Sequence, residues 1–454
     1  MAANRFIRDF TTGPVWGPLV RFSIPFMLSN ALQVLYSTVD MFIVGQVVGK
    51  DGLAAVTNAS RICTFLTMVC LGLATSGQVY VAQLLGQGRK KDLNDSIGTL
   101  FSFLGLIGIG MSALGILFAR PILDLLQVPQ EAYGGALSYL IVCSAGLVFT
   151  YGYNMVSAVL RGMGDSRHPF VFIAIASVAN ILLDVLFIAG FGWGCFGAAL
   201  ATILGQAISF AYAAAYLYRH RDEFCFDFRR ESFRIRQRVL SAMLRLGLPF
   251  VVRFAAVNVS MLYVIRLVNG VGIAASTVFG VGVQLDDLVT KVTQGIMMAV
   301  TGMVGQNFGA GKPDRIRKIV AYSWLFALGF YCVFTAFLLG MPEALFGIFT
   351  DDPEVLALAP LFAWTIVWQF PGLILMRGTN GFLNGIGAAR LALVFAFLDG
   401  VVLRIGCSWL FGTVLGWGLR GFIFGYGIAC YGMALPALVY FFFFPWHRRR
   451  VATA

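Results

Sequence analysis

The sequence predicts an all-α polytopic membrane protein with twelve transmembrane helices in two six-helix lobes related by a parallel internal repeat. Only 12% of the 454 residues are charged, against about 25% in a typical soluble protein, and the mean hydropathy is +0.82. Apolar runs of roughly 20 residues recur from end to end, which is long enough to cross a hydrocarbon core of about 30 Å. Because backbone groups in lipid must satisfy their own hydrogen bonds, these runs are expected to be helices.

The expected helices follow the apolar runs in order and are separated by short basic or glycine-rich breaks. Several of them exceed the length that one crossing requires, which predicts tilting or projection beyond the bilayer. The predicted spans are residues 14–45, 53–86, 95–119, 132–161, 168–190, 195–218, 239–268, 275–308, 317–340, 355–384, 389–411 and 420–444.

Basic and neutral loops alternate between these helices. Lys and Arg gather near both chain ends and in every second loop, for example at 89–91 and 312–318, whereas VVGKDG (47–52) and FTDDPEV (349–355) are neutral or acidic. The positive-inside rule therefore predicts a multi-pass protein of the cell (inner) membrane with both termini cytoplasmic. The formal net charge of +12 follows from this topology, and no nucleic-acid partner is expected.

The two halves of the chain repeat each other. VAQLLGQG at 81–88 matches VGQNFGAG at 304–311, and LRGMGDSR at 160–167 matches LNGIGAAR at 383–390, both at an offset of 223 residues. An even number of helices in each half makes the repeats parallel, a plan that suits alternating access. We expect an N-lobe (1–218), a cytoplasmic linker (219–238) that serves as a tether or binds anionic lipid, and a C-lobe (239–454).

Two acidic residues interrupt apolar runs of the first half. Asp184 follows Asn180 by about one helical turn, and Asp40 shares a helix face with Gln33 and Tyr36. At 1.5 Å per residue from the cytoplasmic ends, both acids reach the outer half of the membrane. A carboxylate at that depth costs at least a few kcal/mol unless it is paired or hydrated, so it is expected to have a function. Hydrogen bonding between helices is the alternative.

Longer motifs around these acids resemble the multidrug and toxic compound extrusion (MATE) family. They are STVDMFIVGQVVGKDGLAAV (37–56), VLRGMGDSRHP (159–169), ANILLDVLFI (179–188) and GQNFGAGK (305–312). The resemblance implies twelve helices in two lobes, exchange of an amphipathic substrate for Na⁺ or H⁺, and no cofactor besides that ion. Carried over residue by residue, it implies a cation-coupling cluster of Asp40, Asn180, Asp184, Thr202, Tyr36 and Asn154.

The chemistry of this cluster fits either coupling ion. Two carboxylates in low dielectric repel each other, so the pair can take up a proton. Carboxylate, amide and hydroxyl oxygens are also hard ligands that suit Na⁺, which could bind at Asp40 and Asp184. No other metal is expected, since the eight cysteines and three histidines lack metal-site spacing.

The second half lacks this cluster, because the repeat aligns Asp40, Asn180 and Asp184 with Val264, Leu403 and Cys407. It carries buried arginines instead. One hypothesis is that arginine–aspartate pairs bind the C-lobe together, such as Arg404 with Asp399 or Arg253 with Asp286, because buried Arg almost always has a partner. The other is that Arg253 or Arg377 meets an anionic group of the substrate. The candidates for lining a substrate cleft are Gln33, Arg253, Arg377 and Asp286.

The predicted function is a monomeric, cation-coupled (H⁺ or Na⁺) antiporter that exports amphipathic organic compounds by alternating access. Its partners are the lipid bilayer and a small-molecule substrate. A flippase for a lipid-linked saccharide and an exporter of an anionic amphipathic metabolite are the alternatives. An enzyme is not expected, because the sequence has no HExxH or GxSxG motif. A Walker A motif and a selectivity-filter repeat are also missing, which argues against ATP as the direct energy source and against a channel.

Overall fold

The structure, a computed structural model, describes residues 8–453, except for the side chains of residues 254–259. Every regular element in this part of the chain is a helix, which confirms the all-α class. Among the described residues, ten helical segments are long and apolar enough to cross a membrane, or eleven if the bent pair α5 (Gln130–Ala145) and α6 (Leu147–Gly162) is one span. Helix α9 (Gln237–Asn269), which contains 254–259, has 33 residues and is also long enough to cross.

The chain forms two compact units that do not divide at the linker. Unit 1 consists mainly of Leu28–Gly247, and unit 2 of Phe10–Met27 together with Leu248–Ala452. Helix α1 (Trp16–Val47) therefore begins in unit 2, where Leu19 and Phe22 lie in its hydrophobic core, and continues in unit 1. The first part of α9 belongs to unit 1 in the same way. The lobe boundaries expected from the sequence stay a prediction.

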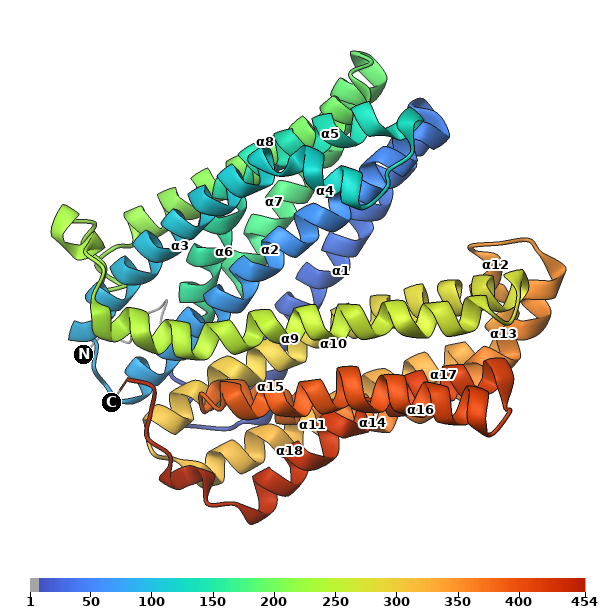
Figure 1. The fold of residues 1–454 in the computed structure, drawn as a ribbon. Helices are drawn as coiled ribbons and strands as arrows, with labels where there is room; N and C mark the ends of the chain where they lie inside the picture. Colours follow the sequence, from blue (N-terminus) through green and yellow to red (C-terminus); the bar gives the residue numbers. More distant parts are fainter. Residues whose placement is uncertain (1–7, 454) are drawn as a thin grey trace. The chain divides into compact units, whose positions relative to one another are not determined.

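Unit 1 is a bundle in which the long helix α2 packs against α3, α5 and α6, while α7 packs against α8 (Figure 1). Its helices, besides those already given, are α2 (Gly49–Gly86), α3 (Lys91–Leu117), α4 (Ala119–Leu125), α7 (Arg167–Asp184), the π-helix η1 (Val185–Gly190), α8 (Gly194–Arg219) and the 3₁₀ turn η2 (Arg230–Phe233).

Unit 2 repeats this plan, with α10 packed against α11, α13 and α14, and α14 against α18. Its helices are α10 (Ile273–Gly309), α11 (Pro313–Gly340), α12 (Pro342–Gly347), α13 (Pro353–Ile366), η3 (Val367–Gln369), α14 (Phe370–Gly385), α15 (Ala389–Phe397), the π-helix η4 (Leu398–Leu403), α16 (Arg404–Trp409), the π-helix η5 (Leu410–Val414), α17 (Gly418–Ile428), α18 (Tyr431–Phe443) and η6 (Trp446–Arg448).

Details of the backbone repeat as well. The short helices α4 and α12, which the hydropathy pattern does not predict, occupy equivalent places in the two halves, and so do the π-helices η1 and η5. Gly192 and Gly416 follow those π-helices with φ of 69° and 72°. This left-handed backbone favours glycine, which explains why GWG recurs in both halves. The repeat therefore preserves turns and helix irregularities, not only helix lengths.

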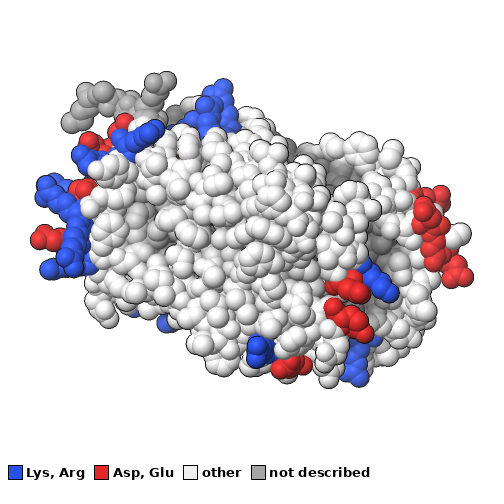
Figure 2. Space-filling model, turned by 90° about the horizontal axis from the view of Figure 1, so that it is seen from above, with Lys and Arg blue, Asp and Glu red and all other residues white. Residues whose placement is uncertain are grey.

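The surface has the character expected of a chain surrounded by lipid. Leu117, Trp364 and Phe443 leave 73%, 64% and 81% of their surface exposed, and most of the face in Figure 2 carries no charge of either sign. Such extensive apolar exposure is unusual for a soluble monomer. The chain is a multi-pass membrane protein.

The linker between the halves is held along α3. Asn94 donates a hydrogen bond to Ser232 at 3.1 Å, the Arg236 backbone N–H donates to Thr99 at 3.1 Å, and the Arg236 guanidinium lies 3.2 Å from an Asp95 carboxylate. Gly98 lets the two backbones touch, because a Cβ there would overlap the carbonyl oxygen of Ser232. This part of the linker is therefore docked on unit 1 rather than extended away from it.

Candidate functional site

Asp40 and Asp184 meet inside unit 1. Asp40 lies on α1 with 8% of its surface exposed, and Asp184 is fully buried at the end of α7. The two carboxyl groups are close enough for the charge of each to act on the other. The backbone changes from α-helix to π-helix directly after Asp184, an irregularity that often occurs at functional sites. The acids that the sequence predicts to share one depth are thus neighbours.

Three of the four carboxyl oxygens of this pair are buried and have no hydrogen-bond donor in the described part of the chain. Within the described residues, Asp40 Oδ1, both Asp184 oxygens and Asn180 Oδ1 are buried and unpartnered. Two ionised carboxylates cannot bond each other, since each only accepts. An unsatisfied buried acceptor costs about 1–3 kcal/mol, and a charged one more. A proton, a cation or a water molecule among these oxygens would supply the missing partner.

Thr202 and Asn180 join the same cluster from α8 and α7. Asn180 Nδ2 points to Thr202 Oγ1 at 3.5 Å, and Thr202 in turn donates to the Ala198 carbonyl at 3.0 Å. Gly205, one turn further along α8, brings the two helices together. A Cβ at Gly205 would lie 2.9 Å from the Ala176 carbonyl oxygen and 3.3 Å from Asn180 Cβ. The close approach of α7 and α8 thus sets the place of the Asn180 amide.

The other predicted members lie less directly in the cluster. Tyr36 is one turn before Asp40 on α1, and the charge of Asp40 acts on its hydroxyl. Asn154 is buried but donates to the Thr150 carbonyl of its own helix at 2.8 Å. Gln33 is exposed on α1. The roles assigned to these three residues remain predictions.

The ligand chemistry of the cluster fits a small, hard, singly charged ion. Every unpartnered atom described in this cluster is an oxygen, and only two of its side chains, Asp40 and Asp184, are acidic. Such a set of ligand oxygens suits Na⁺ or a proton. No group of three or more His, Cys, Asp or Glu side chains with metal-binding geometry occurs in the part of the chain that the structure describes. The cluster thus resembles a monovalent cation site more than a transition-metal site.

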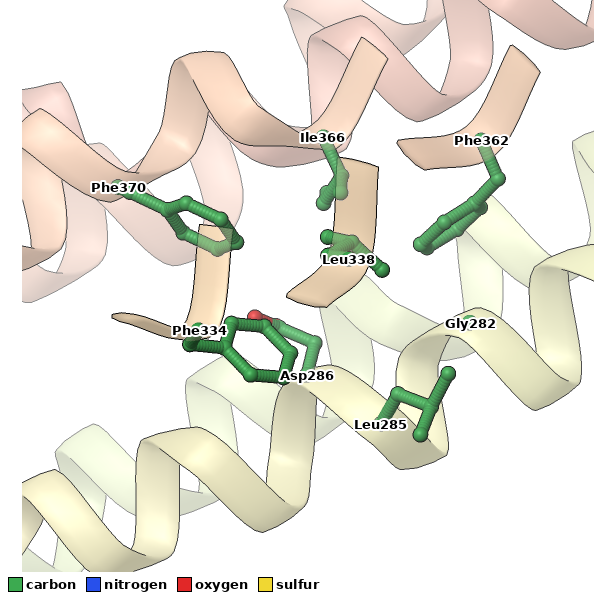
Figure 3. Close-up of a pocket in the computed structure, with 8 residues that line it drawn as sticks. All are labelled: Gly282, Leu285, Asp286, Phe334, Leu338, Phe362, Ile366 and Phe370. Atoms are coloured by element: carbon green, nitrogen blue, oxygen red, sulfur yellow. The ribbon is translucent and has the colours of Figure 1, made fainter. Parts of the chain in front are cut away.

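Asp286 is the buried acid of unit 2, and its two oxygens are both bonded. Gln369 donates to one at 2.8 Å and Tyr426 to the other at 3.2 Å. Figure 3 shows this carboxyl at a small cavity with Phe334 and Phe370, among other apolar side chains. Gln369 and Tyr426 were not predicted from the sequence. Each is a polar side chain within an apolar run, and hydrophobic patterning alone does not assign a role to such a residue.

The arginines of unit 2 divide into a paired one and two others. Arg404 lies 3.2 Å from Asp399 and stacks over the Tyr426 ring at 5.1 Å, which confirms the predicted Arg404–Asp399 pair. Arg253 donates to Asn380 at 2.9 Å, whereas the cation whose charge acts on Asp286 is Arg377. The suggested pairing of Arg253 with Asp286 is therefore not found in the structure.

Comparison with known proteins identifies the transporter class. The MatE family model matches residues 25–186 and again residues 249–410, so the two halves each carry one copy of the family domain. The chain belongs to the MatE family. It is a membrane protein of the multidrug efflux transporter class, and members of this family are transporters rather than enzymes.

Relatives and solved structures agree with this assignment over nearly the whole chain. The chain is 30% identical to "Probable multidrug resistance protein YpnP" of Bacillus subtilis (strain 168), covering 98% of this chain and 99% of that protein. It is 23% identical to a protein of Shewanella oneidensis named "FAD transporter", covering 93% and 95%. A MOP superfamily transporter from Pyrococcus furiosus Vc1 (DSM3638) superimposes with a TM-score of 0.89 at 22% identity, covering 95% and 96%.

Proposed function

We propose that this MatE-family protein is an antiporter that couples entry of H⁺ or Na⁺ to export of amphipathic organic compounds. The observation that carries the proposal is the set of buried acceptor oxygens on Asp40, Asp184 and Asn180 without a donor. A site whose free oxygens a cation would satisfy can take one up on one side of the membrane and release it on the other. The protein needs no cofactor besides this ion.

The cation can act on the whole transporter through α1. Asp40 lies in the part of α1 that belongs to unit 1, whereas Trp16–Met27 of the same helix belong to unit 2. Pro25 removes one backbone hydrogen bond within α1 and so provides a place where the helix can bend. Cation binding relieves repulsion between Asp40 and Asp184. The resulting repacking of α1 in unit 1 would be transmitted to unit 2 and drive alternating access.

The remaining features of the proposal follow from loop charge and family. The basic loops favour both termini in the cytoplasm of a bacterial-type cell membrane. The working unit is proposed to be a monomer with a small-molecule substrate. Tyr36 and Asn154 are proposed as outer members of the cation site, and Gln33 as a residue of the substrate path.

The first test is ethidium efflux from energised cells or everted vesicles at equal expression. Asp40→Asn and Asp184→Asn are expected to lose efflux, whereas Asp51→Asn, at an exposed acid on α2, should keep it. Collapsing the proton gradient and the sodium gradient in turn identifies the ion. Gradient-driven efflux that persists in both variants would exclude this pair as the coupling site.

A second candidate is export of an anionic amphipathic metabolite. It is favoured by the arginines of unit 2, three of which accompany two acids in one buried region. The name of the Shewanella oneidensis relative, an FAD transporter, describes an anionic amphipathic substrate for that protein. A flippase for a lipid-linked saccharide would need the same basic residues. Absence of ethidium efflux in the wild type, with transport of an anionic dye, would favour this second candidate.

A further inference from the structure

Four polar side chains of unit 2 come together from three helices. Arg253 lies on α9, Tyr331 on α11, and Arg377 and Asn380 on α14. Arg377 has 4% of its surface exposed and Asn380 1%, whereas Arg253 is partly exposed. Arg253 is attracted by the charge of Asp399 and repelled by that of Arg377. The region thus combines a buried arginine, Arg377, with a partly exposed one, Arg253.

The hydrogen-bonding capacity of Arg377 is largely unused. A guanidinium carries five N–H donors, yet the bond of Arg377 is to the Tyr331 hydroxyl at 3.5 Å, and its Nε has no acceptor among the described residues. Asn380 Oδ1, an acceptor on the same helix, accepts from Arg253 at 2.9 Å instead. A buried guanidinium with free donors lacks the acceptors that normally accompany it.

The two buried acids of this region, Asp286 and Asp399, are bonded to residues other than Arg377. Asp399 is held by Arg404 at 3.2 Å, and both oxygens of Asp286 accept hydrogen bonds from Gln369 and Tyr426. The charge of Asp286 attracts Arg377, but each oxygen of Asp286 already accepts a hydrogen bond from another residue.

The charge balance of the region is therefore positive. Arg253, Arg377 and Arg404 face Asp286 and Asp399, which leaves one positive charge in excess. The nearby, exposed Asp287 and Lys291 act on each other, and Asp287 also acts on Arg404; together they add one charge of each sign, so the excess stays at one. A buried charge without a partner is expensive, so a negative group is expected to complete the region.

We propose that Arg377 and Arg253 form the binding site for a carboxylate or phosphate group of the transported compound. Guanidinium groups bind such planar or tetrahedral anions through paired hydrogen bonds. Tyr331 also packs against Phe370, with ring centroids 5.4 Å apart, and Phe334 lies 5.6 Å from Phe370. These rings offer an apolar surface beside the charge, so the ligand class is an amphipathic organic anion. This inference rests on the proposed export function and adds amphipathic organic anions to the compounds that the protein exports.

The test is equilibrium binding of two dyes that share a xanthene scaffold but differ in charge. Fluorescein, an anion, and rhodamine 123, a cation, are titrated with the purified full-length protein in a nonionic detergent, and binding is followed by fluorescence anisotropy. The wild type is expected to prefer fluorescein. Arg377→Gln should weaken fluorescein binding at least tenfold while leaving rhodamine 123 binding unchanged or stronger, because only the anion loses a charged partner.

Matched variants make the result specific. Arg420→Gln removes an exposed arginine of the same unit and should leave both affinities unchanged. If Arg377→Gln does not fold, Arg253→Gln and the charge-preserving Arg377→Lys replace it. Arg253→Gln is expected to weaken fluorescein binding, and Arg377→Lys to weaken it less than Arg253→Gln. Equal fluorescein affinity in wild type, Arg377→Gln and Arg420→Gln, or no preference for fluorescein in the wild type, would overturn the proposal.

Two further arms distinguish a substrate site from the cation site and from a lipid site. Binding is measured without an ion gradient, so it reports this site and not the coupling step; fluorescein binding by a wild type that shows no gradient-driven efflux distinguishes failure of coupling from failure of this site. Phosphatidylglycerol is added as a competitor, because a lipid headgroup carries the same phosphate chemistry. Complete displacement of fluorescein by phosphatidylglycerol, with no fluorescein transport in proteoliposomes, would assign the arginines to lipid and overturn the substrate assignment.

Discussion

Units 1 and 2 carry their buried charged side chains at positions that are not equivalent in the repeat. Unit 1 has Asp40, Asn180 and Asp184, and the matching residues of unit 2 are Val264, Leu403 and Cys407. In the opposite direction, the polar residues of unit 2 match smaller, neutral or apolar ones in unit 1. At an offset of 223 these pairs are Arg377 with Asn154, Asn380 with Ser157, Gln369 with Gly146 and Tyr426 with Ile203.

The two clusters also differ in what they lack. Unit 1 has acceptor oxygens without donors, which a cation would satisfy. Unit 2 has satisfied acids and an arginine with unused donors, which an anion would satisfy. Both halves of the repeat keep the same backbone features, such as the GWG turns and the short helices α4 and α12, whereas their buried charges differ. The two proposals together assign ions of opposite sign to two units of one fold.

The largest effect is expected from moving the carboxylate between equivalent positions. Asp184→Cys should lower gradient-driven ethidium efflux at least tenfold, because the remaining oxygens cannot hold a cation in its place. Adding Cys407→Asp should not restore efflux, since Val264 and Leu403 replace the partners that Asp40 and Asn180 provide. Restored efflux in the double variant at equal expression would mean that the two units are interchangeable.

Breaking the ion pair of unit 2 is expected to affect stability rather than coupling. Arg404→Met leaves Asp399 buried without its cation, which costs about 3 kcal/mol in comparable buried pairs. Asp184→Asn, in contrast, removes a charge that has no partner and should keep or raise the melting temperature. Thermal unfolding of the purified variants in detergent measures both. A double variant, Arg404→Met with Asp399→Leu, should recover most of the loss.

A smaller effect is expected from crowding α7 against α8. Gly205→Ala places a Cβ 2.9 Å from the Ala176 carbonyl oxygen, and overpacking of this kind costs about 1–3 kcal/mol. The shift also displaces Asn180, so efflux should fall more than stability explains. The control is Gly110→Ala in α3, where a Cβ meets no atom within 4 Å. Equal efflux in the two variants would argue that the place of Asn180 is not critical.

The smallest effect concerns the docked linker, which has no counterpart in the second half. Ser232 and the Arg229 backbone N–H donate to Asp227, and these bonds hold the pKa of that carboxyl below its usual value. Their contribution is present at neutral pH and is lost as the pH falls through the acidic range in which Asp227 takes up a proton. Asp227→Asn should mimic this loss.

Hydrogen exchange of residues 226–236, corrected for the intrinsic rate, measures the linker directly. We expect faster exchange in Asp227→Asn at pH 7, and in the wild type at pH 3, with transport little changed. Asp222→Asn, at an exposed acid in the same linker, is the control. The same exchange in all three proteins at pH 7 would mean that Asp227 does not hold the linker.

The sequence predicts much of the cation cluster but less of unit 2. Asp40, Asn180 and Asp184 stand out because charged and amide groups are rare in apolar runs, and helix periodicity places them on defined faces. The environment of Arg377 could not be predicted in this way. Tyr331 and Asn380 are inconspicuous in sequence, and their proximity to Arg377 and Arg253 depends on how α9, α11 and α14 pack.

The sequence by itself determined the helical membrane class, the internal repeat and the residues that carry buried charge, because hydrophobic length and the cost of charge in lipid act locally along the chain. Only the tertiary structure decided which of those charges are satisfied. It joined Asp286 to Gln369 and Tyr426. It left the oxygens of Asp184 and the Nε of Arg377 without partners. Satisfaction of a buried polar group depends on atoms distant in sequence, which only packing brings within hydrogen-bonding distance.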